Sequence, residues 1–309
     1  TTKTKTVWYC TSCGNEMSKW MGQCPACKEW NTIVEAPSQP RMGVPSGSRQ
    51  DRKPLMLKDV DSRAEARRSL GSTEVDRILG GGIVPGSLVL IGGEPGIGKS
   101  TLSLQIPLHS PHLKTLYVTG EESARQVKMR ADRLGGDASN CHIFAETLLE
   151  RILEEAEAMV PDLMIVDSVQ TMYTESVEST AGSVSQIKEI AARLLRFAKE
   201  SGVPVILIGH ITKDGYIAGP KILEHIVDVV LQFEGEDKGT YRVLRSIKNR
   251  FGSTSELAVF EMTGAGLREI DNPSEMLIPM HKEGLSGTAV CAMLDGVRPF
   301  LFEVQALVS

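Results

Sequence analysis

Residues 93–100 read Gly93-Glu94-Pro95-Gly96-Ile97-Gly98-Lys99-Ser100, and this stretch decides the fold of the chain. It has the pattern G-x-x-x-x-G-K-S and lies between the apolar run Leu88–Ile91 and a segment that begins like a helix. In that context the glycines let backbone N–H groups surround phosphate oxygens at a helix N-terminus. The lysine reaches the β and γ phosphates, and the hydroxyl of Ser100 ligates Mg²⁺. The sequence therefore predicts that Gly93 through Thr101 bind ATP, with Mg²⁺ as its companion ion.

Apolar runs alternate with helical patterns around this loop, over residues 69–270. The predicted strands are Leu88–Ile91, Thr115–Thr119, Leu163–Val166, Val203–Ile208 and Val227–Phe233, followed by Arg242–Ile247 and Leu257–Phe260 as antiparallel strands. Glu121–Leu134, Leu148–Met159 and Val184–Glu200 have helical spacing and charged outer faces. Near-continuous apolar strands that alternate with helices predict an α/β domain with a mostly parallel sheet covered on both faces.

Polar residues follow three of these strands, where a parallel sheet brings strand ends together. Asp167 ends an apolar strand and is placed to orient a magnesium-bound water. Glu121 or Glu122 is placed to polarise the attacking water, with Glu121 favoured, although either could instead complement a helix dipole. His210 follows the fourth strand, and the residues alone leave open whether it senses the γ-phosphate or is a satisfied strand-end histidine.

Four of the six cysteines lie near the N-terminus as Cys10-x-x-Cys13 and Cys24-x-x-Cys27. Two such pairs aim four thiolates at one point, which predicts a structural Zn²⁺ site with no open position for catalysis. A redox dithiol pair is the alternative. All three tryptophans also lie in this first unit, residues 1–35, which is too short to build an adequate apolar core alone.

Two further segments flank the α/β domain. Residues 36–68 are rich in Pro, Ser and Gly and then in basic residues, which predicts a linker. Residues 271–309 contain two strand-like runs, Thr288–Leu294 and Arg298–Val304, around Asp295-Gly296. We expect this hairpin to open a further domain in a truncated chain. The alternative is a hairpin that docks on the α/β domain.

The run Lys248-Asn-Arg250-Phe-Gly252 places two cations beside an apolar sheet. One interpretation is a cationic finger inserted into the ATP site of a neighbouring subunit. Another is a contact to the phosphate backbone of DNA. The third is a solvated turn.

Overall charge limits the function classes. Lys and Arg number 34 and Asp and Glu 39, a net charge of −5, which makes a globally basic nucleic-acid coat protein a poor interpretation. No apolar run approaches the ~18 residues that span a bilayer, and the N-terminal segment lacks the apolar core of a signal peptide. We therefore expect a cytoplasmic protein without a membrane partner.

Taken together, these motifs resemble the bacterial RadA/Sms family of DNA-repair ATPases, relatives of the RecA recombinase. The resemblance covers essentially the whole chain in order. Besides the cysteine finger and the phosphate loop, it rests on Tyr117–Ser123, Val166–Ser168, Gly209–Gly215 and the family's own signature Lys248–Gly252.

The resemblance implies a RecA-like ATPase core that forms a homo-hexameric ring on single-stranded DNA and drives branch migration of recombination intermediates. It implies that Glu121 activates water and that His210 senses the γ-phosphate. It also places Lys248 and Arg250 at the subunit interface, near ATP or DNA. The stretches Ser168–Ser183 and Thr212–Lys221 would be DNA-facing loops, and Lys213 and Lys221 would contact phosphates because Glu175 and Glu178 make the first loop acidic.

The family also has a C-terminal domain that resembles the Lon protease fold, and residues 288–309 resemble its opening hairpin. Recombinase or helicase proteins would be further partners. Two other functions stay open. One is a nucleotide-gated adaptor, and the other is a replicative-type ring helicase, against which the zinc finger and Lys248–Gly252 weigh.

Overall fold

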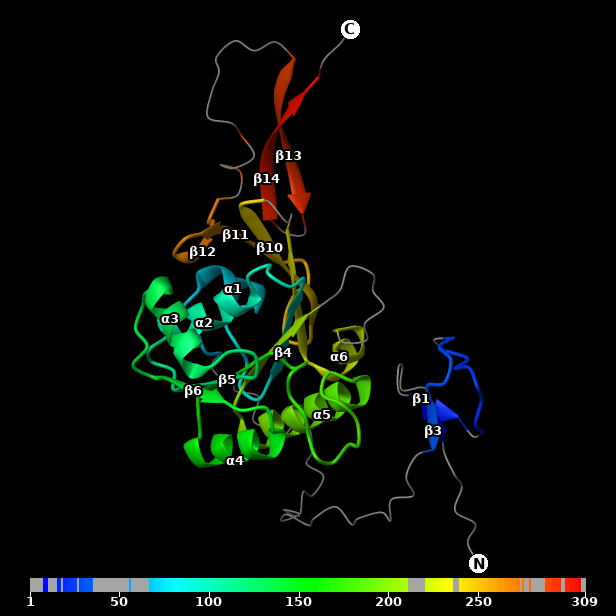
Figure 1. The fold of residues 1–309 in the computed structure, drawn as a ribbon. Helices are drawn as coiled ribbons and strands as arrows, with labels where there is room; N and C mark the ends of the chain where they lie inside the picture. Colours follow the sequence, from blue (N-terminus) through cyan, green and yellow to red (C-terminus); the bar gives the residue numbers. More distant parts are fainter. Residues whose placement is uncertain are drawn as a thin grey trace, which may run out of the picture.

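The computed structural model describes residues 8–10, 16–17, 19–26, 28–35, 56, 67–210, 220–235, 239–272, 274, 278, 287–295 and 298–306. Within them a nine-stranded sheet has the order β12-β11-β10-β9-β4-β8-β7-β5-β6 (Figure 1). Its strands are β4 (Leu88–Gly93), β5 (Thr115–Thr119), β6 (Cys141–Ala145), β7 (Leu163–Asp167), β8 (Val205–His210), β9 (Val229–Glu234), β10 (Tyr241–Asn249), β11 (Leu257–Thr263) and β12 (Gly266–Glu269). In the sheet, the neighbouring strands β9, β4, β8, β7, β5 and β6 pair in parallel. Strands β10, β11 and β12 add an antiparallel edge next to β9.

Helices cover both faces of this sheet, as the alternating pattern predicts. They are α1 (Thr73–Ile78), α2 (Lys99–His109), α3 (Ala124–Leu134), α4 (Leu149–Met159), α5 (Val184–Ser201) and α6 (Pro220–Ile226). Because strand side chains alternate, Val89 and Ile91 of β4 join a core with α1, α2 and α3, whereas Leu88 and Leu90 join a core with α4 and α5. This is the RecA-like arrangement that the resemblance implies.

The starts of two elements differ from the sequence-based prediction for a local reason. Helix α3 begins at Ala124 rather than Glu121, because Ser123 and Gln126 form a capping box. Strand β8 begins at Val205, after Pro204, which has no N–H to donate to a sheet. The short α1 and the edge strands β6 and β12 were not predicted; the residues of β6 are only half-buried or exposed, so they lack a continuous apolar run.

The predicted linker ends earlier than residue 68. Arg68 forms an isolated bridge with Ile83, and its NH1 donates to the carbonyl of Asp162 at 2.5 Å. The NH2 of Arg67 donates to the carbonyl of Phe251 at 2.6 Å. Both arginines therefore belong to the α/β domain, which the composition alone does not show because basic residues also occur in linkers.

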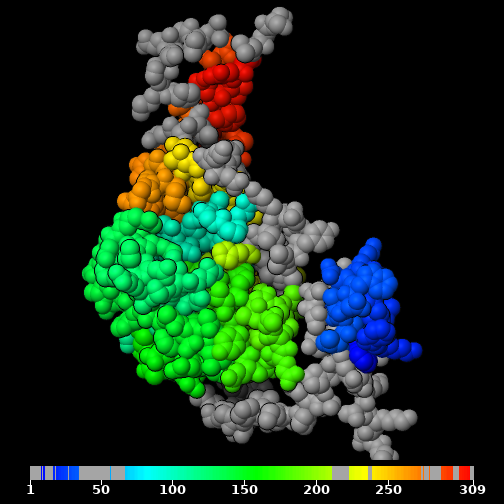
Figure 2. Space-filling view, in the orientation of Figure 1, coloured from blue at the N-terminus to red at the C-terminus, as the bar shows by residue number. Residues whose placement is uncertain are grey.

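The C-terminal hairpin consists of β13 (Thr288–Asp295) and β14 (Arg298–Gln305). In Figures 1 and 2 it projects beyond the β11 end of the sheet. Its Phe300 is buried against Leu257 and Val259 of β11, and the Leu301 N–H donates to the Ser274 hydroxyl at 3.0 Å. The hairpin thus contacts the α/β domain at one end, as in the alternative given above, because the large aromatic side chain of Phe300 packs on an apolar strand surface. The prediction that it opens a further domain stays a prediction.

The N-terminal unit is a small sheet of β1 (Trp8–Cys10), β2 (Glu16–Met17) and β3 (Ile33–Glu35), in the order β2-β1-β3. Cys10 and Cys24 are both fully buried, next to Ile33, Trp8 and Met17. No helix in the described part of the chain is long and apolar enough to cross a membrane.

Candidate nucleotide site

The loop between β4 and α2 is shaped by its glycines. Gly98 caps α2 with a φ of 117°, a left-handed value that favours glycine. A Cβ there would stand 2.8 Å from the Cε of Met262, and one on Gly93 would stand 3.0 Å from the Cβ of Phe233. The loop is therefore packed tightly against Met262 and Phe233 at Gly98 and Gly93. At Gly96 it is open, because a Cβ there would meet nothing within 4 Å.

Lys99 is buried inside this loop. Its Nζ donates to the carbonyl oxygens of Gly93 at 2.9 Å and Glu94 at 2.8 Å. Burial lowers the pKa of Lys99 to about 8, although the nearby carboxylates of Asp167, Glu121 and Glu94 oppose the shift. An anion entering the loop would compete with these carbonyls for the ammonium group.

Asp167 lies at the end of β7 and offers an oxygen to a ligand. Its Oδ2 accepts a hydrogen bond of 2.7 Å from the Tyr117 hydroxyl, whose pKa is raised, first by burial and then by Asp167. Its Oδ1 is buried and has no hydrogen-bond partner among the described residues. A buried carboxylate oxygen without a donor is costly unless a cation or water binds it, so Asp167 fits the predicted Mg²⁺ role, with Ser100 at the start of α2 as the second ligand.

Glu121 faces the same edge from the loop after β5. Its Oε1 accepts a hydrogen bond of 2.5 Å from the Ser168 hydroxyl and lies 3.2 Å from Nε2 of His210. Burial alone would raise the pKa of Glu121, but these hydrogen bonds and the positive charges of His210 and Lys99 outweigh it and lower the pKa. The group is therefore held as a carboxylate.

Glu122 points elsewhere. Its carboxylate forms an ion pair with Arg130 of α3, and its backbone N–H donates to the Thr119 hydroxyl at 3.1 Å. Of the two glutamates that the sequence offered, the structure brings Glu121 together with His210. The predicted catalytic role of Glu121 remains a prediction.

His210 ends β8, and its Nδ1 is buried without a partner among the described residues. Gln170 donates to the His210 carbonyl at 3.3 Å and so joins the segment after β7 to the end of β8. Lys213 lies outside the described residues, as does the side chain of Lys221. Glu175 and Glu178 are exposed, as expected for the acidic loop.

Sequence reasoning missed Gln186, which shapes that loop from α5. The buried amide accepts from the Thr174 N–H at 2.9 Å and donates to the carbonyls of Thr174, Val177 and Ser179. It missed Arg242 as well, whose buried guanidinium donates to the Ile97 carbonyl behind the phosphate loop at 3.1 Å. Other polar residues lie close to both in the sequence, so no local pattern distinguishes Gln186 or Arg242.

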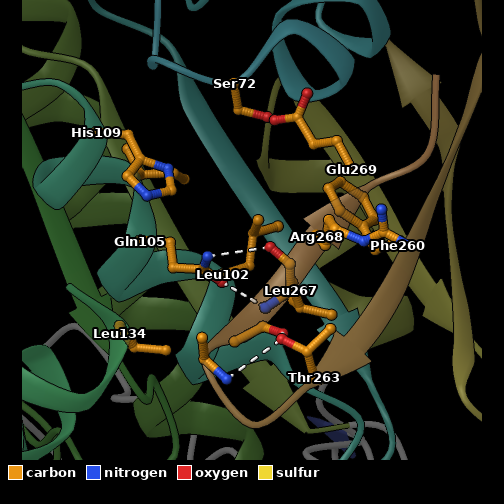
Figure 3. Close-up of a pocket in the computed structure, with 13 residues that line it drawn as sticks. Ser72, Leu102, Gln105, His109, Leu134, Phe260, Thr263, Leu267, Arg268 and Glu269 are labelled. Carbon is orange, nitrogen blue, oxygen red and sulfur yellow. Dashed lines mark hydrogen bonds between the residues drawn. The ribbon is translucent and has the colours of Figure 1, made fainter. Parts of the chain in front are cut away.

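A cavity of about 420 Å³ lies between α2 and the β11–β12 turn (Figure 3). The Gln105 amide crosses it with two hydrogen bonds to the backbone of Leu267, at 3.0 and 2.9 Å. None of the predicted site residues lines it, so the predicted nucleotide site is the open loop and not this cavity.

The signature run Lys248–Gly252 lies at the other end of β4. The Nζ of Lys248 donates to the carbonyls of Glu224 at 2.5 Å and Val227 at 2.7 Å, at the end of α6. Arg250 NH1 lies 3.3 Å from Asp228, which also accepts from the N–H of Leu88, the first residue of β4. A strand rises about 3.3 Å per residue, so this end stands roughly 17 Å from the phosphate loop of the same chain.

Of the four predicted zinc ligands, Cys10 and Cys24 are described and buried together, and Cys10 contacts the Thr32 hydroxyl at 3.1 Å. Cys13 and Cys27 lie outside the described residues. Two buried sulfurs from separate CxxC pairs fit the chemistry of a thiolate-bound Zn²⁺.

Comparison with known proteins agrees with both units. A family profile described as an AAA domain matches residues 51–216, and one described as a rubredoxin metal binding domain matches residues 8–35. The DNA repair protein RadA of Listeria monocytogenes is 48% identical over 99% of this chain and 68% of its own length. The RadA of Bacillus subtilis is 47% identical over 99% of this chain and 69% of its own. The chain belongs to the RadA family of DNA repair proteins.

Solved structures confirm the RecA-like fold of the α/β domain. A RadB recombinase is 25% identical, with a TM-score of 0.52, and matches 66% of this chain and 99% of its own. The KaiC-like protein PH0186 of Pyrococcus horikoshii is 22% identical, with a TM-score of 0.55 over 66% of this chain and 99% of its own, and shows the fold alone.

Proposed function

We propose that this chain is a DNA-dependent ATPase that assembles into a hexameric ring, binds single-stranded DNA and drives branch migration of recombination intermediates in the cytoplasm. Its family is one of DNA repair proteins with a RecA-like ATPase core. The observation that carries the proposal is the cluster of Lys99, Asp167, Glu121 and His210 along the C-terminal ends of four adjacent strands.

In this proposal each residue acts on the triphosphate by its position. Lys99 leaves the carbonyls of Gly93 and Glu94 and pairs with the β and γ phosphates. Mg²⁺, held by Ser100 and Asp167, would neutralise charge on those phosphates when bound. Among the described contacts, both Ser168 and His210 engage Oε1 of Glu121, which leaves Oε2 to take the proton of the attacking water.

His210 links this chemistry to DNA. Its Nε2 lies against Glu121, and the predicted DNA-facing stretch Thr212–Lys221 follows it directly along the chain. A shift of His210 on γ-phosphate binding would therefore move the start of that stretch. Gln170 lies in the first predicted DNA-facing stretch, Ser168–Ser183, and its hydrogen bond to the His210 carbonyl joins that stretch to the end of β8.

In a ring, the adjacent copy would supply Arg250 as a further group at the ATP site. Because Arg250 stands at the opposite end of β4 from the phosphate loop, it would act on the ATP of an adjacent copy and not on its own. Arg250 would stabilise the charge that develops on the phosphates during hydrolysis.

The test is ATP turnover and solution mass, each with and without single-stranded DNA and an ATP analogue. We expect DNA to raise turnover, nucleotide to favour a ring, and DNA affinity to fall steeply with salt because phosphate contacts release counterions. If single-stranded DNA does not change the rate of ATP turnover at any salt concentration, the result would contradict the motor function and favour a nucleotide-gated adaptor.

A further inference from the structure

A buried carboxylate outside the signature run holds that run in place. Asp228 lies between α6 and β9 and is only 1% exposed. Its Oδ2 accepts hydrogen bonds from the Leu88 N–H at 3.1 Å and from Lys199 Nζ at 2.8 Å, and its Oδ1 lies 3.3 Å from Arg250 NH1. A buried carboxylate is expensive unless it is paired, so these contacts are the reason that it is tolerated.

The backbone around Arg250 is pinned on both sides. The Arg250 N–H donates to the Asp228 carbonyl at 3.2 Å. The side chain of Asn249 accepts from the Phe251 N–H at 2.9 Å, and Lys248 is tied to the end of α6. The turn that carries Arg250 is therefore rigid, which is what a group acting on a distant substrate requires.

The Arg250 side chain is still available. It is 53% exposed, and a guanidinium has five donors, of which the structure engages NH1 with Asp228. Lys199 binds the other carboxylate oxygen and lies 5.5 Å from the centre of the Phe251 ring. Because Lys199 offsets much of the Asp228 charge, Arg250 keeps an outward positive field.

We propose that Asp228 is a positioning residue for ATP hydrolysis in the adjacent copy: it orients Arg250 so that the remaining guanidinium donors reach the triphosphate held by the neighbour's phosphate loop. This inference rests on the ring proposed above. Arg250 makes the contact, and Asp228 acts only through it. Lys248, by contrast, serves the turn because its ammonium group is committed to the carbonyls of α6.

The first test compares Asp228→Asn with Glu234→Gln in the full chain, assembled on single-stranded DNA. Glu234 of β9 pairs with Arg245 of β10 at 3.0 Å, outside the turn that carries Arg250. We expect Asp228→Asn to lower kcat about tenfold through misalignment of the finger. The affinity for an ATP analogue and the KM should stay within twofold, and Glu234→Gln should leave kcat within twofold.

A second test excludes a merely structural effect. In an Arg250→Ala background, Asp228→Asn should lower kcat no further. Mixing Asp228→Asn chains with Lys99→Ala chains should give more turnover than the two alone, because the second chain supplies an intact Arg250 to the first chain's ATP. A mixture that only averages its components would overturn the inference.

The outcomes separate this inference from the ring proposal. If Arg250→Ala lowers kcat and Asp228→Asn does not, only the positioning role fails. If Arg250→Ala leaves kcat unchanged in the assembled protein, the role of Arg250 across subunits and the positioning role of Asp228 both fail, while the ring itself stands. Should Asp228→Asn not fold, Arg250→Lys replaces it: a single ammonium cannot hold Asp228 and also present a planar set of outward donors, so full activity of Arg250→Lys would contradict the inference.

Discussion

The two ends of strand β4 carry opposite kinds of polar chemistry. At the end that leads into the phosphate loop, Asp167 Oδ1, Gln170 Oε1 and His210 Nδ1 are buried without partners among the described residues. At the other end, both oxygens of Asp228 are engaged, and Lys248 is tied to the carbonyls that close α6. At the phosphate end these unpaired buried groups are available to a ligand, whereas the satisfied groups at the other end hold a rigid turn.

This contrast predicts that changes at the phosphate end alter activity, whereas changes at the far end alter stability or the neighbour's activity. The largest effect should come from Lys99→Ala. Without the ammonium group in the loop, we expect ATP turnover to fall about a thousandfold. Far-UV circular dichroism and the melting temperature should show an intact fold.

The matched control is Lys128→Ala on the exposed surface of α3, where the lysine forms an ion pair with Asp132. It should retain full turnover. Substantial ATP hydrolysis by Lys99→Ala would contradict the role of the phosphate loop in hydrolysis. It would also contradict the contrast between the two ends of β4.

The next effect separates the two adjacent glutamates. Glu121→Gln should lower kcat about a hundredfold while ATP-analogue binding persists, because only the proton acceptor is lost. Glu122→Gln should lower kcat far less, since the ion-pair partner of Glu122 is Arg130 of α3. Single-turnover kinetics measure this, and equal losses in both variants would refute the assignment to Glu121.

A smaller effect concerns pH. The pKa of Lys99 is lowered to about 8 by burial, so the ammonium group loses its proton as the pH rises through that value. Affinity for an ATP analogue should therefore weaken by up to about tenfold between pH 7 and pH 9. In Lys99→Arg the dependence should vanish, because arginine stays charged.

The same group links pH to the stability of the nucleotide-free protein, with the opposite sign. The folded-state pKa of Lys99 lies below the ordinary value of 10.5, so between about pH 8 and 10.5 the unfolded chain binds more protons. The contribution of Lys99 to stability therefore rises with pH across that window. Calorimetric titrations with an ATP analogue and denaturant titrations of the nucleotide-free protein, at the same pH values, measure the two trends. Affinity should fall with rising pH, whereas the contribution of Lys99 to stability should rise.

The smallest effect contrasts stability at the two ends. Lys248→Met removes two hydrogen bonds to the end of α6 and should lower the free energy of unfolding by about 1–2 kcal/mol. Asp167→Asn removes a buried, partly unpaired charge and should leave nucleotide-free stability unchanged or slightly higher. A clear loss of stability in Asp167→Asn would show that its free oxygen is better satisfied than the contacts indicate.

Local patterns in the sequence were sufficient to predict the phosphate loop, the parallel strands around it and the paired cysteines. Each depends on neighbouring residues: glycines that permit a tight loop, apolar runs that prefer a covered sheet, and CxxC pairs that fold into knuckles. Asp167 and His210 could also be located, because parallel strands bring their C-terminal ends to one edge of the sheet.

Contacts between distant segments were decided only by the tertiary structure. Glu121 and Glu122 are adjacent and chemically identical, and only the packing of α3 against the loop sends one to His210 and the other to Arg130. Asp228 lies inside the predicted strand Val227–Phe233, and the sequence does not show its contacts with Leu88, Lys199 and Arg250. The physical reason is that a charged side chain is positioned by the partners that the fold brings to it, and those partners lie far away along the chain.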